Sequence, residues 1–199
     1  MFESQFFLWF GMMFPLVFSA GPANVTMASL GARFGFLKSL PFITGINLIV
    51  LLHALLIGFG AGRFLEGYPG MFRYLQYAGS AYLIYLAFKF YKPRPSGTGN
   101  STMESVPGFF DGIILQLLNV KVITVTMVMF SQFLNTDSGQ LSRIMMLSFG
   151  LASLTTGATM AWAAGGAWLT RKFASEASIR WQGYIFGSML IGISVWMLV

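Results

Sequence analysis

Residues 19–26 read SAGPANVT and lie in the middle of the first long apolar run of the chain, Phe6–Leu30. A run of this length can cross a bilayer as a helix. The Gly21-Pro22 pair removes a backbone donor and crowds the preceding turn, so it predicts a break in that helix. In lipid, such a break is tolerated where protein or a water-filled cavity satisfies the freed backbone groups. The stretch therefore predicts a broken membrane helix that borders a cavity.

The composition indicates an integral membrane protein. Hydrophobic residues make up 56% of the 199 and charged residues 9%, whereas about a quarter of a soluble domain is charged. The net charge of +6 comes without any basic cluster longer than two residues, which favours topology-setting loops over nucleic-acid binding. With no cysteine, one histidine and six acids, the chain offers no cofactor site, no metal site and no clustered groups for an enzyme. The opening MFESQ lacks the basic residues of a signal peptide, so we interpret the first run as a permanent transmembrane helix.

Windows of about twenty apolar residues predict six membrane spans. They are Phe6–Leu30, Ser39–Gly62, Met71–Phe90, Phe109–Phe133, Leu141–Leu169 and Trp181–Val199. A segment rich in Pro, Gly and Ser, residues 92–108, reads as a linker. It separates a first three-helix unit, residues 1–91, from a second, residues 109–199.

The distribution of positive charge predicts the orientation. Loops after spans one, three and five, with their helix ends, carry eight Lys and Arg residues, and loops after spans two and four carry three. The richer side should face the cytoplasm, which makes the linker cytoplasmic and puts both termini on the periplasmic side. Three spans per unit also mean that the second unit enters the membrane in the opposite sense. The predicted fold is thus an all-α polytopic membrane protein with six helices in two inverted three-helix repeats, as in several transporters.

The fourth span contains polar residues that match the interruption of the first. The stretch QLLNVKVITVT brings Gln116, Asn119 and Lys121 close together. At about 1.5 Å per residue, Lys121 lies roughly 18 Å into the span, near the middle of the membrane. A lysine at that depth is a candidate for a functional site, although it could also anchor the bundle by binding a carbonyl or a lipid headgroup.

Four segments, taken in order, resemble the LysE/RhtB family of bacterial amino-acid exporters over nearly the whole chain. They are SAGPANVTMASLGARFGFLKSLPFITG, YLQYAGSAYLIYLAFKFYK, GFFDGIILQLLNVKVITVTMVMFSQF and GYIFGSMLIGISVWML. The family's Pro-Gly-Pro and Leu-Leu-Asn-Pro-Lys motifs are the most specific parts, and this chain has Ala20 and Val120 at one proline of each. Since valine keeps its backbone donor, the sharpness of a break in the fourth span is left open. The resemblance implies an inner-membrane exporter that is driven by the proton gradient.

An amino-acid substrate is a zwitterion, so a midplane site needs partners for a carboxylate and for an ammonium group. Freed N–H groups at a half-helix N-terminus favour the carboxylate, and freed carbonyls favour the ammonium group. Lys121 is a partner for the carboxylate, while amide side chains can donate or accept. The predicted substrate-binding residues are Gly21, Pro22, Asn24, Gln116, Asn119 and Lys121. For the amides, interhelical packing is an equally weighted alternative.

Proton coupling needs a titratable group inside the bundle, and the sequence offers three. His53 lies well inside the second span, and histidine exchanges protons near neutral pH. Asp111 lies in the first turn of the fourth span, where it could instead complement the helix N-terminus. Lys121 is the third. We expect a proton-coupled exporter of neutral or hydrophobic amino acids or related metabolites, with a passive channel or facilitator as the alternative. The expected partners are the substrate, protons and lipid. Gly183 and Gly187 form a small-residue face that permits close helix approach within the chain or across a homodimer.

Overall fold

The computed structural model describes residues 2–61, 69–91, 106–134, 140–173 and 175–198. All regular structure in these ranges is helical, which confirms the predicted all-α class. The helices are α1 (Phe2–Phe18), α2 (Pro22–Phe34), α3 (Phe36–Leu56) with a π-helical turn η1 (Ile57–Ala61), α5 (Pro69–Tyr91), α6 (Phe109–Leu117), α7 (Val120–Phe133), α8 (Gln140–Lys172) and α9 (Glu176–Trp196). Most of the predicted linker, residues 92–105, lies outside the described ranges.

Two of the predicted spans are sharply bent. The first consists of α1 and α2, which meet at 58°, and the fourth consists of α6 and α7, which meet at 63°. Two continuous helical segments, Phe36–Gly60 and Gln140–Lys172, are each long and apolar enough to cross a membrane, and each bent pair is a further candidate span. Helices α5 and α9 are not among these candidates, since Arg and Gln in both helices, together with their tyrosine, glycine and serine residues, lower their mean hydropathy. The helices match the six predicted segments, and membrane crossing by all six stays a prediction.

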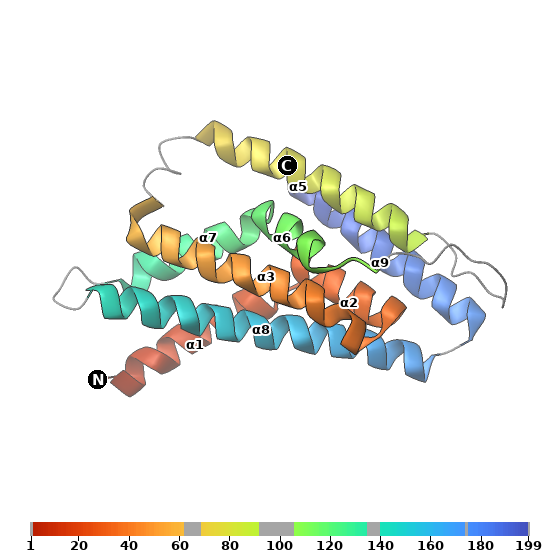
Figure 1. The fold of residues 1–199 in the computed structure, drawn as a ribbon, viewed down its shortest axis with the longest axis horizontal. Helices are drawn as coiled ribbons and strands as arrows, with labels where there is room; N and C mark the ends of the chain where they lie inside the picture. Colours follow the sequence, from red (N-terminus) through yellow and green to blue (C-terminus); the bar gives the residue numbers. More distant parts are fainter. Residues whose placement is uncertain (1, 62–68, 92–105, 135–139, 174, 199) are drawn as a thin grey trace.

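The two halves of the chain pack closely on each other. The most extensive contacts join α2 to α8, α5 to α9, and α3 to α6, and each pair takes one helix from either half. Figure 1 shows the start of α1, the C-terminal end of α3 and the start of α8 at one end of the long axis, with the end of α8 and the start of α9 at the other. The reciprocal bonds Ser80 Oγ to Ser194 O and Ser194 Oγ to Ser80 O, at 2.9 and 3.1 Å, hold α5 against α9.

Glycines bring the backbones of these helix pairs together. A Cβ atom on Gly31 of α2 would overlap the carbonyl of Ala163 in α8, and one on Gly166 would overlap the carbonyl of Ala28. A Cβ atom on Gly45 of α3 would likewise overlap the carbonyl of Phe109 in α6. Since each overlap is with backbone, which cannot turn aside as a long side chain can, these positions require glycine. Gly183 of α9 approaches the Phe90 carbonyl of α5, so this small-residue face packs within the chain, which is one of the two arrangements expected from the sequence.

Candidate binding cavity

The first helix break lies at residues Ser19–Gly21. Gly21 is extended, with φ −169° and ψ 177°, and precedes Pro22, the first residue of α2. Proline suits this position because the N–H that it lacks would have no partner within the helix. The N-terminus of α2 has no side-chain cap, and the first backbone bond is from Val25 N to Gly21 O at 2.9 Å. The sequence prediction of a break at Gly21-Pro22 is confirmed.

Residues of the break itself satisfy part of the freed α1 backbone. Ser19 Oγ donates to Leu16 O at 2.8 Å. Asn24 Nδ2 donates to Val17 O at 2.7 Å and to Ser19 O at 2.9 Å. Helix ends leave carbonyls without intrahelical partners, and here short polar side chains a few residues away supply the donors. Asn24 therefore has a structural role at the break besides any contact with substrate.

The second half of the chain supplies two more donors to this break. Trp162 Nε1 of α8 donates to Phe18 O at 3.1 Å. Lys121 Nζ of α7 donates to Ser19 O at 2.9 Å and to Ser19 Oγ at 2.8 Å. The lysine side chain lies over Gly21, where a Cβ atom would come within 2.9 Å of Lys121 Cδ. A cation at the C-terminal end of α1 is also favoured by the helix dipole.

The second break lies at Leu118 and Asn119, and it forms without proline. Asn119 has non-helical angles, φ −87° and ψ 90°, and serves as the N-cap residue of α7. Its Nδ2 donates to Gln116 Oε1 at 3.0 Å, and its backbone carbonyl accepts from Val122 N at 3.2 Å. The helix thus breaks at Asn119 although Val120 keeps the backbone N–H that a proline would lack.

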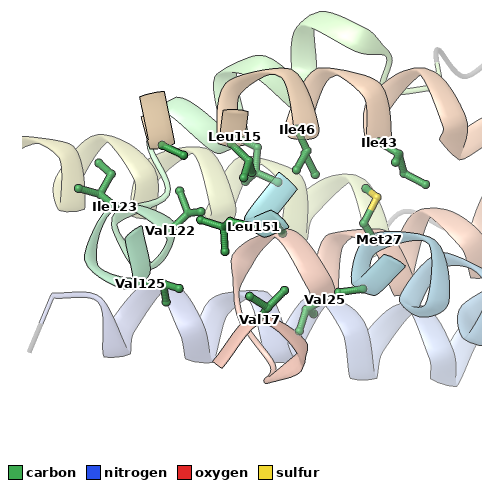
Figure 2. Close-up of a cluster of buried hydrophobic side chains, with 14 of the residues drawn as sticks. Val17, Val25, Met27, Ile43, Ile46, Leu115, Val122, Ile123, Val125 and Leu151 are labelled. Carbon is green, nitrogen blue, oxygen red and sulfur yellow. The ribbon is translucent and has the colours of Figure 1, made fainter. Parts of the chain in front are cut away.

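A cavity of about 40 Å³ lies where the two breaks meet. Five of the six predicted substrate-binding residues line it: Gly21, Asn24, Gln116, Asn119 and Lys121. Pro22 is not a lining residue, although its neighbours Gly21 and Ala23 are. The remaining wall is mainly apolar and consists of Leu16, Val17, Val122, Val125, Leu151 and Thr155. Figure 2 shows Val17, Val122, Val125 and Leu151 within the buried hydrophobic cluster.

Asp111 and His53, two of the three predicted proton carriers, do not line this cavity. Asp111 accepts from the Gly108 backbone N–H at 2.8 Å and lies 3.4 Å from the Tyr82 hydroxyl, so its carboxylate caps α6. His53 is half-buried on α3, and its Nδ1 has no partner among the described residues.

Sequence reasoning missed Ser19 and Trp162 as parts of the site. Ser19 begins the stretch that predicts the break, and a serine beside freed carbonyls was the available signal. Trp162 lies deeper in its span than the other tryptophans do in theirs. A buried indole N–H needs an acceptor within the protein, so this depth was the available signal. Thr155 lines the cavity and was not among the predicted substrate-binding residues.

The fold and the cavity define a multi-pass helical membrane protein of the transporter class, with a polar site at two helix breaks. The chain belongs to the LysE type translocator family, which matches residues 14–199 and confirms the resemblance. It is a translocator and not an enzyme.

The chain is similar to several named proteins. A cysteine/O-acetylserine efflux protein of Escherichia coli K12 is 29% identical over 154 residues, and its counterpart in Salmonella typhimurium is 29% identical over 153, with 77% of each chain covered. An uncharacterized membrane protein of Vibrio cholerae serotype O1 is 24% identical over 182 residues, which cover 89% of each chain. No solved structure matches the chain.

Proposed function

We propose that this translocator exports small neutral amino acids across the bacterial inner membrane and uses the proton gradient to do so. The observation that carries the proposal is the cavity, which gathers five predicted residues from two helix breaks that are about a hundred positions apart in the chain. Half-helix ends that meet at a polar cavity are the usual place for a substrate in transporters with inverted repeats.

The proposed topology has six spans in two inverted repeats, residues 1–91 and 109–199, with residues 92–108 and the basic loops in the cytoplasm and both termini in the periplasm. The order of elements supports it, because each half begins with a bent pair and continues with two further long helices. Successive predicted spans run in opposite directions along the long axis, as consecutive membrane spans would (Figure 1).

In the proposed complex, the substrate carboxylate binds Lys121 and the N-terminus of α2. Lys121 is the ionisable residue among those that line the cavity. The N–H groups of Ala23 and Asn24 begin a helix that has no side-chain cap, and they carry the positive end of its dipole. A carboxylate at this position would replace Ser19 O as the partner of the lysine ammonium group.

The described state is closed to an amino acid. A volume of about 40 Å³ holds a few waters, whereas a cavity that admits benzene measures about 150 Å³. The two breaks must therefore separate before substrate enters. Lys121 connects the two breaks through its bonds to Ser19. If the substrate carboxylate replaced Ser19 as the partner of Lys121, binding would release this connection and so favour separation of the breaks.

The wall of the cavity favours a neutral substrate. Its lining residues include no aspartate or glutamate to pair with a cationic side chain, and five of them are leucine or valine. Two of the similar proteins are named for the efflux of cysteine and O-acetylserine, which are small and neutral amino acids.

Lys121, His53 and Asp111 remain the candidates for proton transfer, and a passive channel or facilitator is the second candidate function. Flux in proteoliposomes over a panel of neutral, cationic and anionic amino acids, with and without an imposed pH gradient, tests both. Accumulation of neutral amino acids that requires the gradient supports the exporter. Flux that only equalises concentrations, at a rate independent of the gradient, would establish the facilitator instead.

A further inference from the structure

One fully buried side-chain oxygen in the cavity wall, Asn119 Oδ1, lacks a hydrogen-bond donor. Six buried side-chain atoms of the described residues have no partner: Trp9 Nε1, Thr26 Oγ1, Asn47 Oδ1, His53 Nδ1, Asn119 Oδ1 and Ser148 Oγ. Of these residues, Asn119 is the one that lines the cavity. A buried acceptor without a donor is costly, so such an atom calls for an explanation.

The neighbours of Asn119 determine which kind of ligand would satisfy this oxygen. Its Nδ2 is bound to Gln116 Oε1 at 3.0 Å, so the amide is held with Oδ1 left over. The side chain is 4% exposed and Gln116 is 1% exposed, so the missing donor must come from a molecule inside the cavity: a water when the site is empty and the substrate when it is bound. A carbonyl oxygen accepts hydrogen bonds and cannot donate them, so it suits an N–H group and repels a carboxylate.

We propose that Asn119 Oδ1 accepts a hydrogen bond from the protonated amino group of the substrate, and that this contact makes the site prefer carboxylates that carry an amino group. The inference rests on the proposed function, in which Lys121 holds the carboxylate of the same molecule. Asn119 and Lys121 lie two residues apart at the start of α7, and both line the cavity. The two ends of one α-amino acid thus have partners of opposite character on a single helix terminus.

Asn24 supports this assignment from the opposite break. Both hydrogen bonds of its side chain use Nδ2, which caps α1, and its Oδ1 has no partner among the described residues. An ammonium group has three donors, so it can use a second amide oxygen across the cavity. Substitution of Asn24 would also remove the caps of α1, and Asn119 is therefore the position for a clean test.

The test compares 2-aminobutyrate with butyrate, two carboxylates that share a carbon skeleton and differ in the amino group. Binding to the full-length protein purified in detergent is measured by calorimetry, so that passive leakage of butyrate is irrelevant. The native protein should bind 2-aminobutyrate at least about 10-fold more tightly than butyrate. In Asn119→Leu the affinity for 2-aminobutyrate should fall about 10- to 100-fold, the effect of losing a hydrogen bond to a charged group, while that for butyrate changes little.

Two further variants complete the design. Asn119→Ser keeps a residue that is favoured at helix N-caps, but its shorter side chain does not place an oxygen where Asn119 Oδ1 lies. This variant should therefore lose the preference for the amine, and it provides the test if the leucine variant fails to fold. Asn47→Leu is the matched control, because Asn47 Oδ1 is also buried and unpaired yet lies outside the cavity; its amine preference should match that of the native protein. Retention of the full amine preference in Asn119→Ser or Asn119→Leu would overturn the inference. Failure of the native protein to bind or transport any amino acid would instead refute the proposed function.

Discussion

Replacement of Lys121 by methionine should separate binding from stability, because the contacts of this lysine can be lost without leaving polar groups unsatisfied. Its Nζ bonds to Ser19 O and Oγ, at 2.9 and 2.8 Å. After the change, Ser19 O keeps the bond from Asn24 Nδ2, and Ser19 Oγ still donates to Leu16 O. The variant also avoids the cost of about 3 kcal/mol for a lysine at the bilayer centre.

The loss of two charge-assisted bonds and the removal of that cost should nearly cancel. We expect the free energy of unfolding to change by about 1 kcal/mol or less, which is a shift of roughly 2–4 °C in Tm. Removal of the charged partner from a desolvated carboxylate should cost about 2–5 kcal/mol of binding, or about 30- to 5,000-fold in Kd. Lys121→Arg keeps the charge in a different geometry and should be partly active.

Thermal unfolding, amino-acid binding and proteoliposome flux of the same preparations provide the measurements. Lys89→Met is the control, because Lys89 lies over the Tyr85 ring at 5.0 Å, at the end of α5 and outside the cavity. Binding without a response to the pH gradient in Lys121→Met would identify the lysine as the proton carrier. Transport by that variant at the native rate, with normal gradient dependence, would refute the assignment of the cavity as the substrate site.

Three further predictions concern the break, the helix packing and the topology. Pro22→Ala should insert and fold normally but export far more slowly, because the alanine N–H permits a straighter first span; native flux would mean that the kink is incidental. Gly31→Ala, which places a methyl group on a backbone carbonyl of α8, should destabilise the protein by at least about 2 kcal/mol in thermal unfolding, whereas Gly165→Ala, with open space around it, should not. In this cysteine-free chain, a single cysteine at the exposed position Gln140 should react with an impermeant thiol reagent in whole cells, and one at exposed Ala177 should not. Labelling of the second position from outside would contradict the inverted topology.

The sequence predicted the helices and the first break well, because both follow from local chemistry. Long apolar runs indicated the helical segments, and the Gly21-Pro22 pair indicated the break, because proline lacks the N–H that would continue a helix. The break at Asn119 was less certain, since Val120 stands where the family motif has proline. In the structure the two halves of this span meet at 63° without a proline, and Asn119, whose side chain bonds to Gln116, lies at the bend.

The contacts across the cavity could not be predicted in the same way. Lys121 was identified by its depth in the membrane, yet its partner Ser19 lies 102 positions away. Nothing in the spacing of either residue points to the other, because the contact depends on how two bent spans pack. Asp111 shows the converse case. Its bond to Gly108 N is local, and the helix-capping interpretation that the sequence allowed is the contact that the structure contains.

The capping of α1 has a consequence for the order in which the protein is built. Ser19 and Asn24 are translated with the first span, so most of the broken backbone has donors as soon as that span enters the membrane. Trp162 and Lys121 are synthesised 144 and 102 residues after their carbonyl partners, and domains are assembled from the N-terminus during synthesis. The first span is therefore bent by its own residues, and Lys121 and Trp162 of the later spans supply the remaining donors. The cavity is thus among the last parts of the nascent protein to form.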